Sequence, residues 1–192
     1  MRPGKEDNRM GLNTISDHIL DILQNSMDSG ATLVELKIDE QPGEFFSFVI
    51  TDDGSGIEAD KLKLVLDPFY TEKKKQKVFG LGLPLLKQAA ENTGGSFSIE
   101  SFPGKGTRVE ARLFLSNIDC QPVGNLADVF LSALTMKDQV RVVVERVVGS
   151  EGYSIDSQEI LNLLGDDYRS NPSKMKKLYS FLEEAERLSR RN

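Results

Sequence analysis

Apolar and polar residues follow one another along this chain with two different periods, one typical of helices and one typical of strands. Between residues 14 and 27 the apolar side chains recur at helical spacing, which predicts a helix that ends at a serine and a glycine. Residues 33–39 and 45–52 instead alternate between apolar and polar, around a turn that contains proline and glycine. We therefore expect a helix followed by a β-hairpin.

The same two periods continue to the C-terminus, with a change of pattern between residues 116 and 124. Before this change, the pattern predicts two helices and then two strands, at 58–66, 83–93, 96–101 and 107–115. After it, a helix, a strand and two helices are expected at 126–134, at 139–148, from about 156 (with Ser154 or Asp156 as the cap) and at 172–191. We therefore divide the chain into a domain at 12–118 and a C-terminal α/β extension at 119–192. The pattern leaves open whether this extension is a small second domain or packs on the first.

Composition excludes several classes of protein. The chain has 192 residues, of which 39% are hydrophobic, so it can bury a core. Its net charge of −6 argues against a general binder of nucleic acids or anionic membranes, because such binders need a basic surface. Cys120 is the only cysteine and His18 the only histidine, which excludes an internal disulfide and a Cys/His zinc site. No run of about 18 apolar residues occurs and the first residues lack the apolar middle of a signal peptide, so we expect a cytoplasmic protein.

Asp52 ends the second predicted strand and has the same parity as Phe48 and Ile50. A regular strand would place its carboxylate on the face that these apolar side chains share, where it would be at least partly buried. Burying a carboxylate is costly unless a donor satisfies it, and the exocyclic amine of adenine is such a donor. The plainer interpretation is that Asp52 opens a turn with Gly54 and Gly56.

Asp21 and Asn25 lie one helical turn apart on the first predicted helix. In this arrangement an amide oxygen can ligate magnesium, and a carboxylate one turn earlier can hold or deprotonate a water molecule. Polar residues on an amphipathic helix are, however, usually just its solvated face.

A glycine-rich segment, Gly80–Leu83, comes just before the helix predicted at 83–93. Glycines at a helix start expose backbone N–H groups and the positive end of the helix dipole, and both suit phosphate. The segment has neither the P-loop spacing nor the dinucleotide fingerprint, and it could be a simple turn into a helix. Lysines before it, Lys73 among them, could neutralise phosphate or could simply belong to a solvated surface.

Along the chain, the three segments come in the order Asp21–Asn25, Asp52–Gly56 and Gly80–Leu83. In this order and spacing they resemble the GHKL superfamily of ATPases, which includes DNA gyrase, the heat-shock chaperone of ninety kilodaltons, histidine kinases and mismatch-repair MutL. The resemblance covers Ile15 to Leu115, about half of the chain. It implies the Bergerat ATP-binding fold, a two-layer α/β sandwich of a mixed β-sheet and helices, with Mg·ATP bound between the helices and a lid.

The resemblance also implies roles for individual residues. Asn25 would bind magnesium, and Asp21 would be the general base, one methylene shorter than the glutamate of MutL-like members. Asp52 would bind adenine in a pocket shaped by Gly54 and Gly56. The other ATP-binding residues implied by the resemblance lie in the lid, in the phosphate-binding segment and at the turn before the last strand: Lys73, Gly80, Leu81, Gly82, Leu83 and Thr107.

Three functions are compatible with this resemblance. Too few residues precede residue 14 for the phospho-acceptor domain of a sensor histidine kinase, so any phosphoryl acceptor would be another protein. The leading hypothesis is a stand-alone, cytoplasmic, histidine kinase-like protein that binds Mg·ATP and acts on a protein partner by phosphoryl transfer or lid closure. One alternative is a slow MutL-like ATPase switch, with the C-terminal extension as its homodimerisation element. Another is a non-catalytic regulator in the manner of anti-sigma factors.

Overall fold

The computed structural model describes residues 12–66 and 82–190, and the structural statements below refer to these residues. In chain order, the elements are α1 (Ile15–Asp28), β1 (Leu33–Gln41), β2 (Phe45–Asp52), α2 (Ala59–Val65), α3 (Gly82–Asn92), β3 (Ser96–Phe102), β4 (Gly106–Phe114), α4 (Leu126–Thr135), β5 (Arg141–Val148), β6 (Glu151–Asp156), α5 (Ser157–Leu164), the short 3₁₀ helix η1 (Asp166–Arg169) and α6 (Pro172–Ser189).

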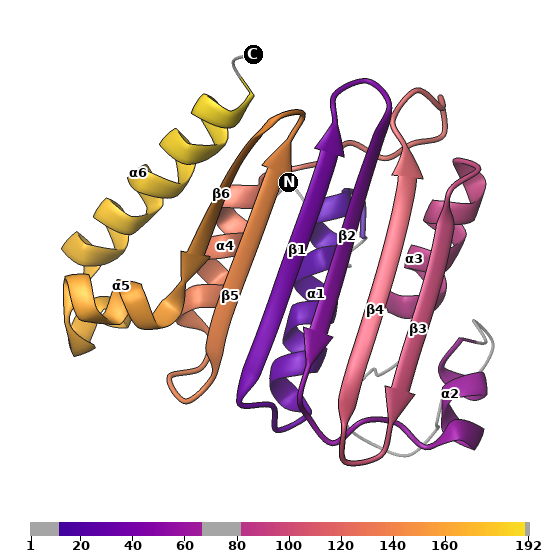
Figure 1. The fold of residues 1–192 in the computed structure, drawn as a ribbon, viewed down its shortest axis with the longest axis horizontal. Coiled ribbons are helices and arrows are strands. Elements are labelled where there is room, and N and C mark those ends of the chain that lie inside the picture. Colours follow the sequence, from indigo (N-terminus) through magenta and orange to yellow (C-terminus); the bar gives the residue numbers. More distant parts are fainter. Residues whose placement is uncertain (1–11, 67–81, 191–192) are drawn as a thin grey trace, which may run out of the picture.

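The strands form a single mixed sheet with the order β3-β4-β2-β1-β5-β6. Neighbouring strands are antiparallel except β1 and β5, which run parallel. Figure 1 shows α1, α3 and α4 behind the sheet, and α5 and α6 beside β6. This arrangement confirms the two-layer sandwich of a mixed sheet and helices that the sequence resemblance implied.

Helix α1 begins with a capping box. The Thr14 hydroxyl accepts a hydrogen bond from the Asp17 N–H at 3.1 Å, and the Asp17 carboxylate accepts one from the Thr14 N–H at 2.9 Å. These bonds satisfy donors that would otherwise be unpaired in the first turn. The apolar face of the helix then packs into the core, where Ile15, Ile19 and Leu23 are fully buried. The predicted helix at 14–27 is thus confirmed to within one residue.

Strand β2 shows the alternation that positions the candidate site. Phe46, Phe48 and Ile50 are buried on the helix-covered face, whereas the residues between them are partly exposed. Asp52 continues this series and is only 6% exposed, which confirms the burial expected from its parity.

The C-terminal extension continues the sheet through β1. Strand β5 pairs with β1 along its whole length, from Arg141 opposite Leu33 to Val148 opposite Glu40. Helix α4 packs against α1 and α6. None of the helices in the described ranges is long and apolar enough to cross a membrane.

Strand β6 was not predicted, because the sequence pattern assigned only helix after residue 148. It is a short edge strand in which Gly152 and polar residues leave little alternation to detect. Of the two cap residues considered for the helix that follows, the structure selects Asp156, whose side chain accepts from the Gln158 N–H at 2.9 Å.

Candidate functional site

The buried carboxylate of Asp52 forms part of a cavity wall at the end of β2. Its Oδ1 atom accepts the Gly54 N–H at 3.0 Å. The Ser29 hydroxyl lies 3.5 Å from the same oxygen but donates more directly to the Ser26 carbonyl, at 2.7 Å. Within the described ranges both contacts thus involve Oδ1, and Oδ2 can accept a hydrogen bond from a ligand.

The turn after β2 requires glycine at two positions. A Cβ atom on Gly54 would lie 1.7 Å from the Ser29 hydroxyl, so a side chain there would separate β2 from the end of α1. Gly56 has a φ of +66°, and a Cβ atom there would lie 2.0 Å from the Phe102 carbonyl oxygen. The two glycines therefore allow the turn to approach α1 and β3 closely.

The neighbouring Asp53 has a structural role instead. Its carboxylate accepts hydrogen bonds from the N–H groups of Thr32 and Leu33, at 2.7 and 2.9 Å, and from the Thr32 hydroxyl at 2.5 Å. These bonds fasten the α1–β1 connection to the end of β2 and lower the pKa of Asp53. The two adjacent aspartates thus make different contacts: Asp52 lines the cavity, and Asp53 binds the α1–β1 connection.

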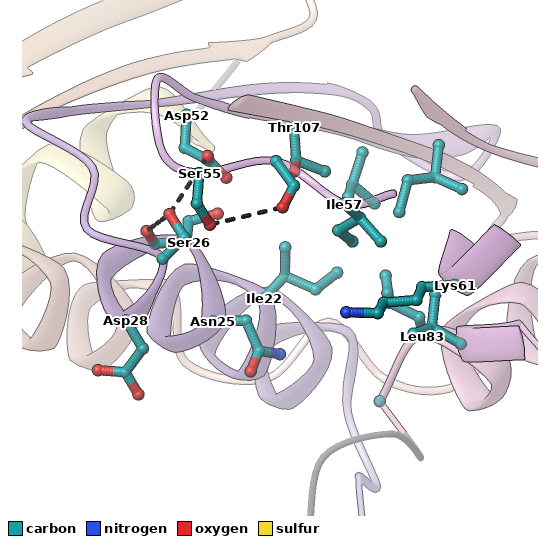
Figure 2. Close-up of a pocket in the computed structure, with 16 residues that line it drawn as sticks. Ile22, Asn25, Ser26, Asp28, Asp52, Ser55, Ile57, Lys61, Leu83 and Thr107 are labelled. Carbon is teal, nitrogen blue, oxygen red and sulfur yellow. Dashed lines mark hydrogen bonds between the residues drawn. The ribbon is translucent and has the colours of Figure 1, made fainter. Parts of the chain in front are cut away.

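The cavity lies between the sheet and helices α1, α2 and α3, and its volume is about 450 Å³. This volume falls in the range of about 300–1,000 Å³ that is usual for small-molecule sites. Figure 2 shows Asp52, Ser55 and Thr107 on one side of the cavity, with Asn25, Lys61 and Leu83 on the other. The apolar part of the lining is formed by Ile22, Ile57, Val65, Leu83, Ile99 and Val109.

Asp21 does not line the cavity itself but contacts two residues that do, Asn25 and Gly82. The Asn25 amide donates to Asp21 Oδ2 at 3.3 Å, which leaves the Asn25 amide oxygen available to a ligand. A Cβ atom on Gly82 would lie 1.8 Å from Asp21 Oδ2, so the start of α3 lies against this carboxylate, and a side chain at position 82 would displace it.

Burial raises the pKa of Asp21, while His18 and the hydrogen bond from Asn25 act in the opposite direction. His18 lies about one helical turn before Asp21 on α1 and is only 1% exposed, and its Nε2 atom lies 3.0 Å from the Gln121 side-chain oxygen. Burial lowers the pKa of His18, which favours the neutral imidazole.

The cavity lining contains several of the residues singled out from the sequence: Asn25, Asp52, Gly56, Gly82, Leu83 and Thr107. Gly54 and Asp21 lie just behind the lining and hold or touch residues within it. Lys73, Gly80 and Leu81 lie outside the described residues.

Sequence reasoning missed other residues of the lining, notably Ser26, Ser29, Ser55, Ile57 and Lys61. Ser29 and Ile57 could have been found from the sequence, because they lie close to the motifs along the chain. Lys61 lies in a short, charged helix whose sequence looks like that of any solvent-exposed helix, so nothing in the sequence pointed to the cavity.

A sheet covered by helices on one face, with a cavity of ligand size between the two layers, defines an α/β sandwich. Residues 13–117 match the family model described as histidine kinase-, DNA gyrase B- and HSP90-like ATPase. The chain belongs to this family.

Two curated relatives are bacterial kinases. The sensor kinase CckA of Brucella abortus (strain 2308) is 30% identical over an alignment of 148 positions, which covers 65% of this chain and 15% of that protein. Sporulation kinase E of Bacillus subtilis (strain 168) is 34% identical over 99 residues, which are 50% of this chain and 13% of that protein. The chain therefore spans only a small part of the length of these relatives.

A solved structure supports the fold independently. The N-terminal domain of a DNA repair protein superposes with a TM-score of 0.50 at 15% sequence identity, over 81% of this chain and 58% of that one. At this identity the similarity concerns the fold alone.

Proposed function

We propose that this chain binds Mg·ATP in the cavity and acts on a partner protein. It would either transfer the γ-phosphoryl group to the partner or bind the partner with a different affinity when ATP is bound. The observation that carries the proposal is the Asp52 carboxylate, which is buried in the cavity wall with one oxygen held by Gly54 and the other open to a donor. The apolar lining suits a flat purine ring beside that carboxylate. Family membership and the kinase names of the relatives support the same proposal.

The cavity is expected to prefer adenine to guanine by roughly 2–4 kcal/mol. The Asp52 carboxylate can accept a hydrogen bond from the amine of adenine, but it would face the carbonyl oxygen of guanine and remain an unpaired buried acceptor. Titration calorimetry with ATP and GTP analogues measures this preference. Asp52→Asn should bind ATP much more weakly and should lose the preference.

Asp53→Asn is the matched control for this experiment, because the neighbouring carboxylate binds Thr32 and Leu33 instead of lining the cavity. It should lower thermal stability and leave the ratio of ATP to GTP affinity unchanged. Equal affinity of the wild type for the two nucleotides would refute the assignment of Asp52 to adenine.

The residues present fit a magnesium ion, which would neutralise phosphate charge at this site. The amide oxygen of Asn25 is a hard oxygen ligand on the cavity wall, oriented by the bond from its own amide nitrogen to Asp21. The described residues contain no cluster of three or more His, Cys, Asp or Glu that could hold a metal ion. We therefore propose that Asn25 supplies the ligand from this chain and that nucleotide phosphates supply others.

Asn25→Ala should weaken ATP binding in magnesium and have much less effect when EDTA is present, because the lost ligand matters only with the metal. Calorimetric titrations of ATP under both conditions provide the measurement. Gln24→Ala is the control, since Gln24 is an exposed amide on the same helix that does not line the cavity. If Asn25→Ala weakens ATP binding equally in both conditions, Asn25 is not the magnesium ligand.

A second function, slow ATP hydrolysis, is favoured by the contact between Asp21 and Asn25 at 3.3 Å. This contact places a carboxylate one turn from the proposed magnesium ligand, where it could deprotonate water.

ATP labelled at the γ-phosphate, incubated with the protein and cell lysate, separates the candidate functions. The label would appear in a protein partner, in free phosphate or in neither, according to whether the chain is a kinase, an ATPase or a non-catalytic regulator.

A further inference from the structure

Lys61 brings a positive charge to the cavity from an element that the sequence motifs do not include. It lies on α2 and forms part of the cavity lining together with Val65, one helical turn later. Figure 2 shows its amine reaching from α2 toward Ile22 and Asn25, across the cavity from Asp52.

The charges of the lining are unevenly distributed. Among the described lining residues, Lys61 is the only basic side chain, and Asp28 and Asp52 are the acidic ones. Lys61 forms no ion pair with an acidic residue in the described ranges. An ammonium group beside apolar side chains gains most from an anionic ligand, because hydrogen bonds between charged groups are about twice as strong as neutral ones.

Within residues 12–66 and 82–190, helix α2 makes little packing contact with its surroundings. None of its side chains is buried, and Glu58 at its N-terminus makes no side-chain capping bond. Core packing therefore contributes little to its position. A ligand bound by Lys61 would consequently help to fix α2 against the cavity.

We infer that Lys61 binds the phosphate chain of the nucleotide, so that the cavity selects nucleoside di- and triphosphates over nucleosides. This inference rests on the proposed ATP site. If Asp52 accepts the adenine amine on one side of the cavity, the phosphates extend toward the other side, where Lys61, Asn25 and Leu83 lie (Figure 2). The start of α3 at Gly82 and Leu83 adds the positive end of a helix dipole to the same side.

The test compares ATP, ADP and adenosine as ligands of the wild type and of Lys61→Met, by calorimetry in magnesium. Methionine keeps the length and the apolar stem of lysine but removes the charge. Lys61→Met should bind ATP about tenfold more weakly, bind ADP more weakly as well, and bind adenosine with unchanged affinity. Lys61→Arg should retain most of the ATP affinity, because it retains the charge.

Lys63→Met provides the matched control, because Lys63 is an exposed lysine of the same helix that does not line the cavity. It should leave the affinity for all three ligands unchanged. The inference is overturned if Lys61→Met binds ATP as tightly as the wild type, or if its affinity for adenosine falls by the same factor as that for ATP. A wild-type protein that binds neither ATP nor adenosine would instead refute the ATP site itself.

Discussion

Arg146→Ala is expected to lower the free energy of unfolding by about 3–5 kcal/mol. The Arg146 side chain is completely buried and forms ion pairs with Glu40 on β1 and Glu186 on α6, the latter at 3.1 Å. Arg190 pairs with the same two carboxylates, but it is 41% exposed. Removing the buried guanidinium would leave two largely buried carboxylates without their closest counter-charge. Urea unfolding followed by circular dichroism gives the measurement.

Lys37→Ala is the control for a charge pair of the same sheet at its surface. Lys37 lies 3.0 Å from Glu145, and both side chains are about half exposed. Its loss should lower the free energy of unfolding by only about 0–1 kcal/mol. Adding Glu40→Gln to Arg146→Ala should recover part of the stability, because it removes one of the uncompensated charges. Equal losses for Arg146→Ala and Lys37→Ala would contradict the importance of the buried cluster.

This ion-pair cluster connects the C-terminal extension to the strands of the ATPase family domain. Glu40 belongs to β1, whereas Arg146, Glu186 and Arg190 come from β5 and the end of α6. The long parallel pairing of β5 with β1 adds a backbone connection between the same parts of the chain. We therefore expect the extension and the family domain to unfold together.

The sequence predicted elements well wherever local chemistry determined them. Helix α1 has its own cap at Thr14 and an apolar stripe, and β2 shows a clear alternation that also predicted the burial of Asp52. The pairing of β5 with β1 could not be predicted, because it joins residues roughly a hundred positions apart and no local signal encodes it. Arg146 has the parity of buried valines in β5, and its partner Glu186 lies on another element.

The candidate site shows the same division. The three motifs predicted the ends of α1 and β2 and the start of α3, which line one cavity. Lys61 was missed because its place in the cavity lining depends on where α2 lies, and this short helix has no buried face from which its orientation could be deduced. The parity of Asp52 with Phe48 and Ile50 set it apart from Asp53, but the hydrogen bonds of Asp53 to Thr32 and Leu33 could be seen only in the structure.

Asp21→Asn is expected to lower the rate of ATP hydrolysis by about 10²–10⁴-fold, with little change in ATP affinity. A general base acts in the transition state, and asparagine keeps the size of the side chain but cannot take a proton. Burial raises the pKa of Asp21. Because the ionised form is the base, hydrolysis should decline with falling pH at a higher pH than for an ordinary aspartate. Phosphate release, measured across pH, tests both expectations.

Asp17→Asn is the matched control, because Asp17 lies one turn earlier on the same helix and serves its capping box. It should weaken the start of α1 and leave the rate of hydrolysis per folded molecule unchanged. Asp21→Glu restores the glutamate of MutL-like ATPases and should hydrolyse ATP at least as fast as the wild type. If Asp21→Asn retains full turnover, Asp21 is not the base, and a protein that phosphorylates a partner or only regulates it becomes the better explanation of this site.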